Sequence, residues 1–208
     1  MNNAVRAITV YCSSSSAVAN AFVNAVRELG RAIALSEWTL VYGGNNVGLM
    51  GHLADAVRAG GGKVIGISPQ LFIDKGIDDK NCHEFVITEC MRTRKAAMEA
   101  RGDAYIALPG GLGTFEEIFE IIVGKQLGVH NKPIVILNID NYYDQMLAQL
   151  EHGIEQGFIK ASARSLFFIA SDVDSAIRHI QTYLPPAPAD KWFANTTAAQ
   201  SETSNSIR

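Results

Sequence analysis

Seven short apolar runs, rich in β-branched and aromatic residues, recur along the chain and are separated by mixed or polar segments. They lie at residues 7–11, 39–44, 63–68, 84–88, 104–111, 133–138 and 166–170. Most of these runs are continuously apolar rather than alternating, which is typical of strands that are buried on both faces of a parallel sheet. The pattern therefore predicts a strand at each run.

Between most of these runs, apolar residues return at helical spacing. Leu49, Leu53 and Val57 recur every four residues, and Ile118 and Ile122 repeat the same interval further along the chain. Strands that alternate with helices are typical of βαβ units. We therefore predict an α/β fold, namely a doubly wound (Rossmann-like), mostly parallel sheet with helices on both faces.

Length and composition fit one domain with a short extension. The chain has 208 residues, of which 48% are hydrophobic and 19% are charged, an ordinary balance for a globular domain. We predict that residues 1–184 form a single α/β domain. After this point the periodicity ends and Pro, Ala, Ser, Thr and Asn dominate, so residues 185–208 are predicted to be a flexible tail.

Charge and cysteine usage argue against several classes of function. A net charge of −3 offers no basic surface for a nucleic acid, so we expect no such partner. The amino terminus contains neither a signal-peptide core nor a membrane span, and the three cysteines form no CxxC pair. These features indicate a cytoplasmic protein without membrane contact. The five histidines are scattered singly, so we expect no metal site.

Ligands of doubly wound sheets bind beyond the carboxyl ends of the strands, which makes three loops candidates for chemistry. The first, "YCSSSSA", carries Ser13 before a predicted helix, where serine either caps the helix or helps to bind an anion. The second, "YGGNNVGLMG", places Gly43 and Gly44 at a strand end. Glycine there lets backbone amides approach a ligand, although turn geometry and packing alone would also favour it. A GxGxxG fingerprint is absent, which argues against a nicotinamide cofactor.

The third loop, "LPGGLGTFEE", lies at residues 108–117. Thr114 and Glu117 have the spacing of a capping box at the start of a helix, an interpretation that needs no ligand. A capping box does not require three preceding glycines, however, whereas exposed amides at the positive end of a helix form a phosphate site. We therefore favour a phosphate-binding loop.

A basic cluster precedes this loop in the segment "CMRTRKAAMEARGD". Arg92, Arg94 and Lys95 fall in the first turn of a predicted helix, where cations oppose the helix dipole. Spacing alone leaves two interpretations open. The cluster is either a solvated helix face, with a Lys95–Glu99 pair, or part of a site.

Two segments taken together, "MRTRK" at 91–95 and "PGGLGTFEE" at 109–117, resemble the LONELY GUY (LOG) family of cytokinin riboside 5'-monophosphate phosphoribohydrolases, long mislabelled as lysine decarboxylases. The resemblance extends over about residues 5–160. It implies a nucleotide-binding domain that uses no cofactor. It also implies hydrolysis of the N-glycosidic bond of N6-modified adenosine monophosphates, which releases a free base and ribose 5-phosphate.

The resemblance further implies roles for individual residues. The catalytic arginine and glutamate of the family match Arg94 and Glu117. A carboxylate beside the sugar would stabilise an oxocarbenium-like state or deprotonate water, and a guanidinium would neutralise charge on the departing purine or on the phosphate. The substrate-binding positions of the family match Lys95, Gly111, Leu112, Gly113, Thr114, Phe115 and Glu116, to which the first two loops add Ser13, Gly43 and Gly44.

Some points stay open at this stage. Plant relatives tend to have a glutamate where an ungapped comparison puts Gly76 and a threonine in place of Val123, so the preferred base or side chain of the substrate is not fixed.

Family members are at least dimers, which predicts a homodimer formed through the apolar face of the Arg94 helix and the helix after Glu117. The alternatives are a general AMP or purine nucleotide nucleosidase and a non-catalytic nucleotide or molybdenum-cofactor carrier. The presence of both Arg94 and Glu117 disfavours the carrier.

Overall fold

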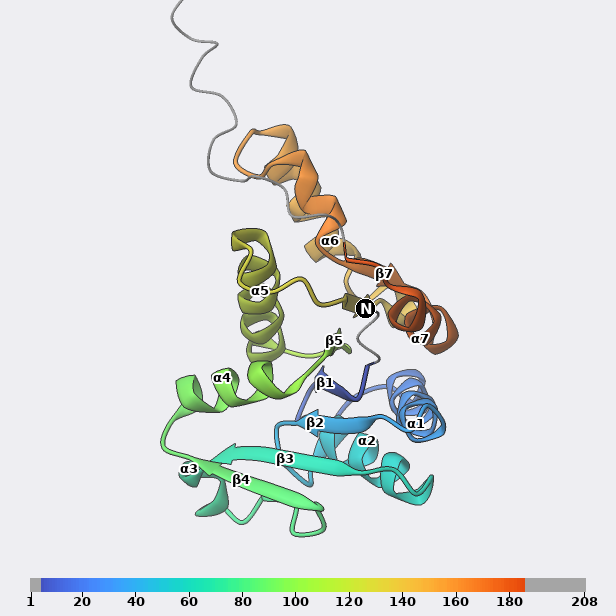
Figure 1. Cartoon of the computed structure of the whole chain (residues 1–208), viewed down its shortest axis with the longest axis vertical. Helices are drawn as coiled ribbons and strands as arrows, with labels where there is room; N and C mark the ends of the chain where they lie inside the picture. The colour runs from blue at the N-terminus through green and yellow to red at the C-terminus, as the bar shows by residue number, and fades with distance from the viewer. Residues whose placement is uncertain (1–4, 186–208) are drawn as a thin grey trace, which may run out of the picture.

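The structure is a computed structural model that describes residues 5–185, and its centre is one sheet in which every strand pair is parallel (Figure 1). Each of the seven predicted apolar runs contributes a strand. The strands are β1 (Ala7–Tyr11), β2 (Thr39–Tyr42), β3 (Val64–Pro69), β4 (Glu84–Thr88), β5 (Ala104–Ala107), β6 (Ile134–Leu137) and β7 (Phe168–Ala170).

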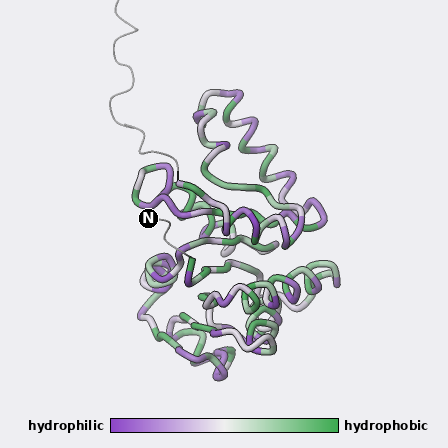
Figure 2. The backbone as a smooth tube through the Cα atoms, turned by 45° about the vertical axis from the view of Figure 1, so that its right-hand side comes forward, coloured by the Kyte–Doolittle hydropathy of each residue, from purple (hydrophilic) through white to green (hydrophobic). Residues whose placement is uncertain are grey.

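Helices follow most of the strands, as the alternating pattern predicts. They are α1 (Asn20–Leu35), α2 (Gly48–Ala59), α3 (Gln70–Ile73), α4 (Met91–Arg101), α5 (Leu112–Leu127), α6 (Asp144–Glu155) and α7 (Val173–Thr182), with short 3₁₀ turns η1 (Ile139–Asn141) and η2 (Ala161–Ser165). Figure 2 shows hydrophobic positions, in green, returning at intervals along these helices between hydrophilic ones.

The strand order is β4-β3-β2-β1-β5-β6-β7. The chain starts in the middle of the sheet, proceeds outward to β4, and then crosses back to add β5 on the other side of β1. Strands β1 and β5 pair in register from Ile8 with Ala104 to Tyr11 with Ala107. The order reverses between these two strands, and ligands of such sheets typically bind beyond the carboxyl ends of the strands at this point.

Two apolar clusters fill the space between the sheet and its helices, one on each face. Leu29 of α1, Leu53 of α2 and Ile180 of α7 belong to one cluster. Met98 of α4 and Ile118 of α5 belong to the other, against which α6 also packs. In Figure 1, α4 and α5 accordingly lie on one side of the sheet, and α1 and α7 lie on the other. The predicted doubly wound sheet is confirmed.

Other predictions about organisation have different outcomes. The predicted tail, residues 185–208, lies outside the described residues except for residue 185, and the division into one domain and a tail stays a prediction. Within residues 5–185, every helix is too short or too polar to cross a membrane. Cys12, Cys82 and Cys90 are free thiols.

Candidate active site

Arg94 and Glu117 meet in the interior of the protein, although they come from different helices. Arg94 comes from the first half of α4 and Glu117 from the second turn of α5, and their Nη1 and Oε1 atoms are 3.3 Å apart. Both residues are buried, with exposed fractions of 4% and 8%. The Nε atom of Arg94 also donates to the carbonyl of Ile67 at the end of β3, at 3.0 Å. The guanidinium is therefore fixed by two partners before any ligand binds.

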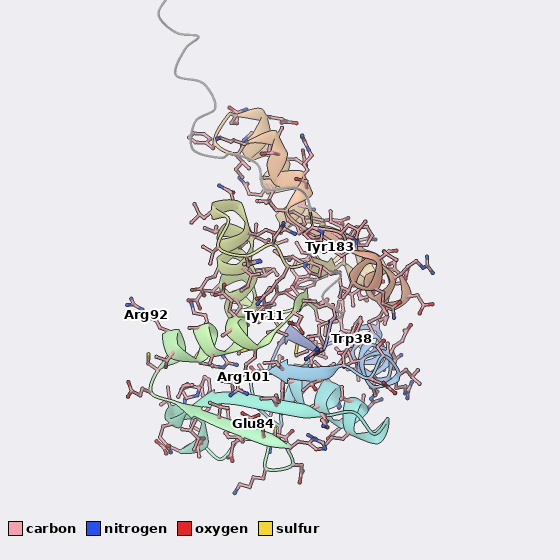
Figure 3. All side chains as sticks on the ribbon, viewed as in Figure 1. Tyr11, Trp38, Glu84, Arg92, Arg101 and Tyr183 are labelled. Carbon is pink, nitrogen blue, oxygen red and sulfur yellow. The ribbon has the colours of Figure 1, made fainter. Side chains whose placement is uncertain are left out.

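The side chains of the other two basic residues at the start of α4, Arg92 and Lys95, point in different directions. Arg92 is exposed and points away from the molecule at the outer end of α4 (Figure 3). Lys95 turns toward α5, where its Nζ binds Glu116 at 2.6 Å and Glu120 at 2.9 Å. The predicted pairing of Lys95 with Glu99 is wrong, because the adjacent helix supplies closer carboxylates.

Gly43 and Gly44, which follow β2, make room for Arg94 and bind a neighbouring loop. A Cβ atom on Gly43 would overlap Nη2 of Arg94, so only glycine leaves room for the guanidinium. The carbonyl of Gly44 accepts the amide of Asp79 at 2.8 Å. Both glycines are buried. These contacts show a packing role for both glycines, and the close approach of their amides to a ligand stays a prediction.

Burial controls the charge of Glu117. Desolvation raises the pKa of its carboxyl from 4.5 to about 7, and this effect outweighs the opposing attraction of Arg94. A carboxyl with a pKa near neutrality exchanges protons readily at physiological pH. Such a group suits general acid–base chemistry better than an ordinary surface glutamate does.

The loop between β5 and α5 presents unpaired amides. Helix α5 begins at Leu112 with Gly111 as its N-cap residue. Among the contacts of residues 5–185, the N–H groups of residues 110–114 find no hydrogen-bond acceptor. Added Cβ atoms on Gly111 and Gly113 would meet nothing within 4 Å, so the backbone there faces open space. Free amides at the positive end of a helix attract anions, so this end of the 16-residue helix α5 is a candidate phosphate site.

The predicted capping box is wrong. The helix begins at Leu112, so Thr114 is its third residue and no side chain caps it. The side chain of Thr114 is buried against Gly110, where any Cβ atom would overlap it. Glu117 turns toward Arg94 and away from the backbone of Thr114. Glycine at position 110 thus serves the packing of Thr114 inside the turn.

The interpretation of Ser13 as a helix cap is also wrong. Helix α1 begins only at Asn20, after an uncapped Ala19. The hydroxyl of Ser13 accepts the amide of Ser15 at 3.0 Å, and its carbonyl accepts the amide of Met50 at 3.3 Å. The serine loop therefore lies against the start of α2, and its placement at an anion site stays a prediction.

The remaining predicted positions lie in different surroundings. The side chain of Leu112 is exposed, whereas Phe115 packs against Tyr143 with ring centroids 6.0 Å apart and points into the core. Gly76 lies in an exposed turn, and Val123 lines an apolar groove between α5 and α6. Any contact of Phe115 or Glu116 with a ligand would therefore use the backbone, since both side chains already have partners.

Sequence reasoning missed a buried cluster that supports the second loop. Asp79 is 1% exposed and accepts hydrogen bonds from Tyr42 and Arg58, each at 2.7 Å. These side-chain bonds, together with the hydrogen bond from the Asp79 amide to the Gly44 carbonyl, hold the segment 74–83 against the end of β2. A lone aspartate in a polar stretch carries no pattern that distinguishes it. Nowhere in residues 5–185 do three His, Cys, Asp or Glu side chains gather closely enough to hold a metal ion.

The fold and the site together define a doubly wound protein with a buried arginine–glutamate pair and a loop of unpaired amides. This loop, residues 108–114, is the candidate anion loop. A family model described as "Possible lysine decarboxylase" matches residues 50–180. "Probable cytokinin riboside 5'-monophosphate phosphoribohydrolase LOGL9" of Oryza sativa subsp. japonica is 43% identical over 180 residues, covering 86% of this chain and 79% of that protein. "Cytokinin riboside 5'-monophosphate phosphoribohydrolase LOG5" of Arabidopsis thaliana is 38% identical over 178 residues, covering 86% and 78%. The chain belongs to the LOG family, as its two motifs indicated.

Solved structures show the same fold at lower identity. The molybdenum cofactor binding protein from Rippkaea orientalis superposes with a TM-score of 0.66 at 24% identity, covering 85% of this chain and 96% of that one. At this identity the likeness shows the shared doubly wound architecture alone.

Proposed function

We propose that the chain is an N-glycosyl hydrolase that cleaves cytokinin riboside 5'-monophosphates, which are N6-modified adenosine 5'-monophosphates. The products are the free base and ribose 5-phosphate. The observation that carries this proposal is the buried Arg94–Glu117 pair, 3.3 Å apart, in which Glu117 lies on the helix whose first turn offers free amides. Membership of a family whose relatives are named for this activity supports it.

In the proposed reaction, Glu117 acts on water and on the sugar. Its ionised carboxylate accepts a proton from water while the water oxygen attacks the anomeric carbon. The bond from that carbon to the purine nitrogen breaks, and its electron pair leaves with the purine, which takes up a proton. The carboxylate also stabilises the positive charge that develops on the ribose ring.

Arg94 supplies a permanent positive charge beside this carboxylate. Because its Nε is already bonded to Ile67 and one terminal nitrogen contacts Glu117, the guanidinium is held in place with N–H groups left for the substrate. Its charge favours the ionised form of Glu117 and neutralises negative charge on the departing purine or on the phosphate.

The phosphate is proposed to bind the amides of Gly111, Leu112, Gly113 and Thr114. It does not react, and its binding energy orients the sugar against Glu117. Lys95, held near the start of α5 by Glu116 and Glu120, would add positive charge to this end of the site. Nucleotides should therefore be cleaved in preference to nucleosides.

A direct assay of base release tests the proposal. The purified chain is incubated with isopentenyl-AMP, AMP and other nucleoside monophosphates, and the free base and ribose 5-phosphate are quantified. We expect release from isopentenyl-AMP and a smaller rate with AMP. Equal rates for both would identify a general nucleosidase, and no release from any nucleotide would contradict the proposal.

Glu117→Gln is the matched control variant in this assay. Glutamine has nearly the same shape and still accepts a bond from Arg94, but it cannot take a proton from water. We expect kcat to fall at least about 100-fold, the scale typical of general acid–base groups. A folded variant with near-normal turnover would remove Glu117 from the reaction.

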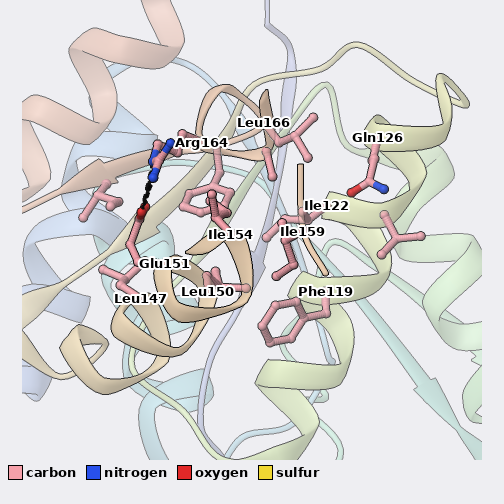
Figure 4. A pocket seen from close by; sticks show the side chains of 14 residues that line it. Phe119, Ile122, Gln126, Leu147, Leu150, Glu151, Ile154, Ile159, Arg164 and Leu166 are labelled. Carbon is pink, nitrogen blue, oxygen red and sulfur yellow. Dashed lines mark hydrogen bonds and ion pairs between the residues drawn. The ribbon is translucent and has the colours of Figure 1, made fainter. Parts of the chain in front are cut away.

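We further propose a homodimer in which a second copy covers an apolar groove between α5 and α6. The groove has a volume of about 450 Å³ (Figure 4). In Figure 4, Phe119 of α5 and Leu150 and Ile154 of α6 face it. Helix α5 is apolar around most of its circumference, so burying one side against the sheet leaves Val123 and Leu127 exposed, at 47% and 54%.

A two-fold arrangement would let each copy place this exposed side of α5 in the groove of the other. Light scattering on the full chain should give twice the mass of one chain, and Val123→Asp should give a monomer of unchanged secondary structure. A monomeric wild-type chain would contradict the dimer.

We also propose a cytoplasmic location, because three free thiols suit a reducing compartment.

A further inference from the structure

Two adjacent tyrosines reach the anion loop from outside the site. Tyr142 and Tyr143 follow β6, more than thirty residues beyond the loop in sequence. The hydroxyl of Tyr143 donates to the carbonyl of Leu108 at 2.6 Å, and the hydroxyl of Tyr142 donates to the carbonyl of Gly110 at 2.6 Å. Neither bond belongs to the sheet or to a helix, so they tie the loop to a separate part of the fold.

The turn that carries these tyrosines is itself held tightly. Asp140 and Asn141 have positive φ angles of 56° and 58°, a conformation that costs energy for residues other than glycine. Asn138 stabilises the turn, since its Oδ1 accepts the amide of Tyr143 at 2.7 Å and its Nδ2 donates to Asp144 at 2.8 Å. The tyrosines are thus placed by a rigid turn.

Ring contacts fix the two phenols further. Tyr143 is fully buried and packs edge-on against Phe115 of α5. Tyr142 packs edge-on against Phe22 of α1, with centroids 5.8 Å apart, and against Tyr143 at 5.0 Å. Their hydroxyls therefore have little freedom to leave the loop carbonyls.

The bond from Tyr142 determines which way one peptide group faces. In a trans peptide the C=O of one residue and the N–H of the next point in opposite directions. Holding the carbonyl of Gly110 toward Tyr142 therefore directs the N–H of Gly111 away from Tyr142. A peptide between two glycines otherwise rotates easily, because neither residue has a Cβ atom to restrict it.

Two other carbonyls of the loop are also occupied. Leu108 bonds to Tyr143, and the carbonyl of Gly111 accepts the amide of Phe115 at 3.0 Å within the helix. An unrestrained carbonyl turned into the site would repel a phosphate. With these carbonyls engaged elsewhere, the loop offers donors to an anion.

We propose that Tyr142 and Tyr143 are positioning residues that lock the β5–α5 loop, so that the amide of Gly111 faces the phosphate of the substrate. The proposal rests on the proposed function, and it assigns the nucleotide-over-nucleoside preference partly to two residues that do not touch the substrate. Tyr142 orients the Gly110–Gly111 peptide, and Tyr143 anchors the start of the loop.

Binding of two ligands to the full chain tests this directly. Ribose 5-phosphate reports on the phosphate site, and adenosine lacks a phosphate. Tyr142→Phe keeps the ring and its packing but removes the hydroxyl. We expect ribose 5-phosphate to bind about tenfold more weakly to this variant, the effect of losing one bond to a charged group, while adenosine binding stays unchanged.

Tyr105→Phe is the matched control. Its hydroxyl donates to the carbonyl of Glu99 at 2.9 Å, which is the same kind of bond at a place outside the anion loop. This variant should bind both ligands as the wild type does. Tyr143→Phe should act like Tyr142→Phe on ribose 5-phosphate and also lower the melting temperature, because it leaves a buried carbonyl without a donor.

The outcomes separate this inference from the proposed function. In turnover of isopentenyl-AMP, Tyr142→Phe should raise KM with kcat nearly unchanged. Unchanged ribose 5-phosphate binding in Tyr142→Phe, or an equal loss for both ligands, would overturn the inference. Failure of the wild type to bind ribose 5-phosphate would overturn it as well. Normal binding without any base release by the wild type would contradict the proposed function alone.

Discussion

Glycine serves opposite purposes in the two glycine-rich loops of this protein. In the segment from Gly43 to Gly51, added Cβ atoms would overlap Arg94, the backbone of Ser14 or the backbone of Asn46. At Gly111 and Gly113 they would meet nothing within 4 Å. The first set is therefore needed for packing between loops, and the second leaves the backbone open to solution.

This difference shows that a glycine-rich motif has no single meaning. After β2 the glycines allow the serine loop, the arginine and the start of α2 to come together. After β5 they leave the main chain open, as the proposed phosphate site requires. Substitution by alanine should distinguish the two, since it displaces neighbouring groups of the protein in one loop and crowds a ligand in the other.

Gly48→Ala should have the largest effect. Its φ angle is +60°, and a Cβ atom would overlap the carbonyl group of Ser14. Strain and overlap together should lower the free energy of unfolding by about 3 kcal/mol and the melting temperature by about 10 °C. Calorimetry checks this. An unaltered melting curve would mean that the serine loop yields freely, and the contrast between the loops would fail.

Gly43→Ala should act mainly on activity. The methyl group would displace the guanidinium of Arg94 from its place beside Glu117. We expect kcat/KM for isopentenyl-AMP to fall about 100-fold, the scale seen when one preorganised donor is lost. Steady-state kinetics at fixed pH measure the change. Normal kinetics in this variant would show that Arg94 need not be held at that position.

Glu117, which lies between the two loops, should make stability depend on pH. Its folded pKa of about 7 exceeds the unfolded value of 4.5, so its favourable contribution is present below pH 4.5 and is lost as pH rises through 7. Relative to Glu117→Gln, the wild type should therefore lose about 2 kcal/mol of stability between pH 5 and pH 8, since one pKa unit is worth about 1.4 kcal/mol.

Melting temperatures of both proteins across this pH range provide the measurement. Glu28→Gln, on the exposed side of α1, is the control, and its curve should run parallel to the wild type. Parallel curves for Glu117→Gln as well would mean that the carboxyl is not held in a desolvated environment.

Gly113→Ala should have the smallest effect of these substitutions, and it should change only the binding of the nucleotide. The methyl group has open space around it, and alanine favours helix over glycine, so the melting temperature should stay equal or rise slightly. KM for the nucleotide should increase about tenfold, because the methyl group crowds a phosphate on the adjacent amides. A lower melting temperature with an unchanged KM would place Gly113 in the packing class with Gly48.

Much of the fold could be predicted because each strand carries its own signal. The strands β5 and β6 are buried on both faces, so nearly all of their residues are apolar and the sequence of each strand alone predicts it. The placement of Arg94 and Glu117 in one site followed from the family motifs, whereas their ion pair is a finding of the structure. Local pattern alone could not give it, since 23 positions separate the two residues.

Contacts between elements were the part that local reasoning missed or misjudged. Thr114 and Glu117 have the spacing of a capping box, yet tertiary packing draws Thr114 against Gly110 and Glu117 toward Arg94. Lys95 similarly forms ion pairs with two carboxylates on α5 and none with Glu99 on its own helix. Tyr142 was missed because nothing in its local sequence indicates which loop its hydroxyl reaches.

Helix α5 carries both the free amides at its first turn and the carboxylate of Glu117 one turn later. Five residues of α-helix span about 7–8 Å along the axis. In the proposed complex, this one helix therefore sets the distance between the bound phosphate and the carboxylate of Glu117. A diphosphate or triphosphate bound through its terminal phosphate would place its ribose farther from Glu117, so we expect nucleoside monophosphates to be cleaved faster than diphosphates or triphosphates.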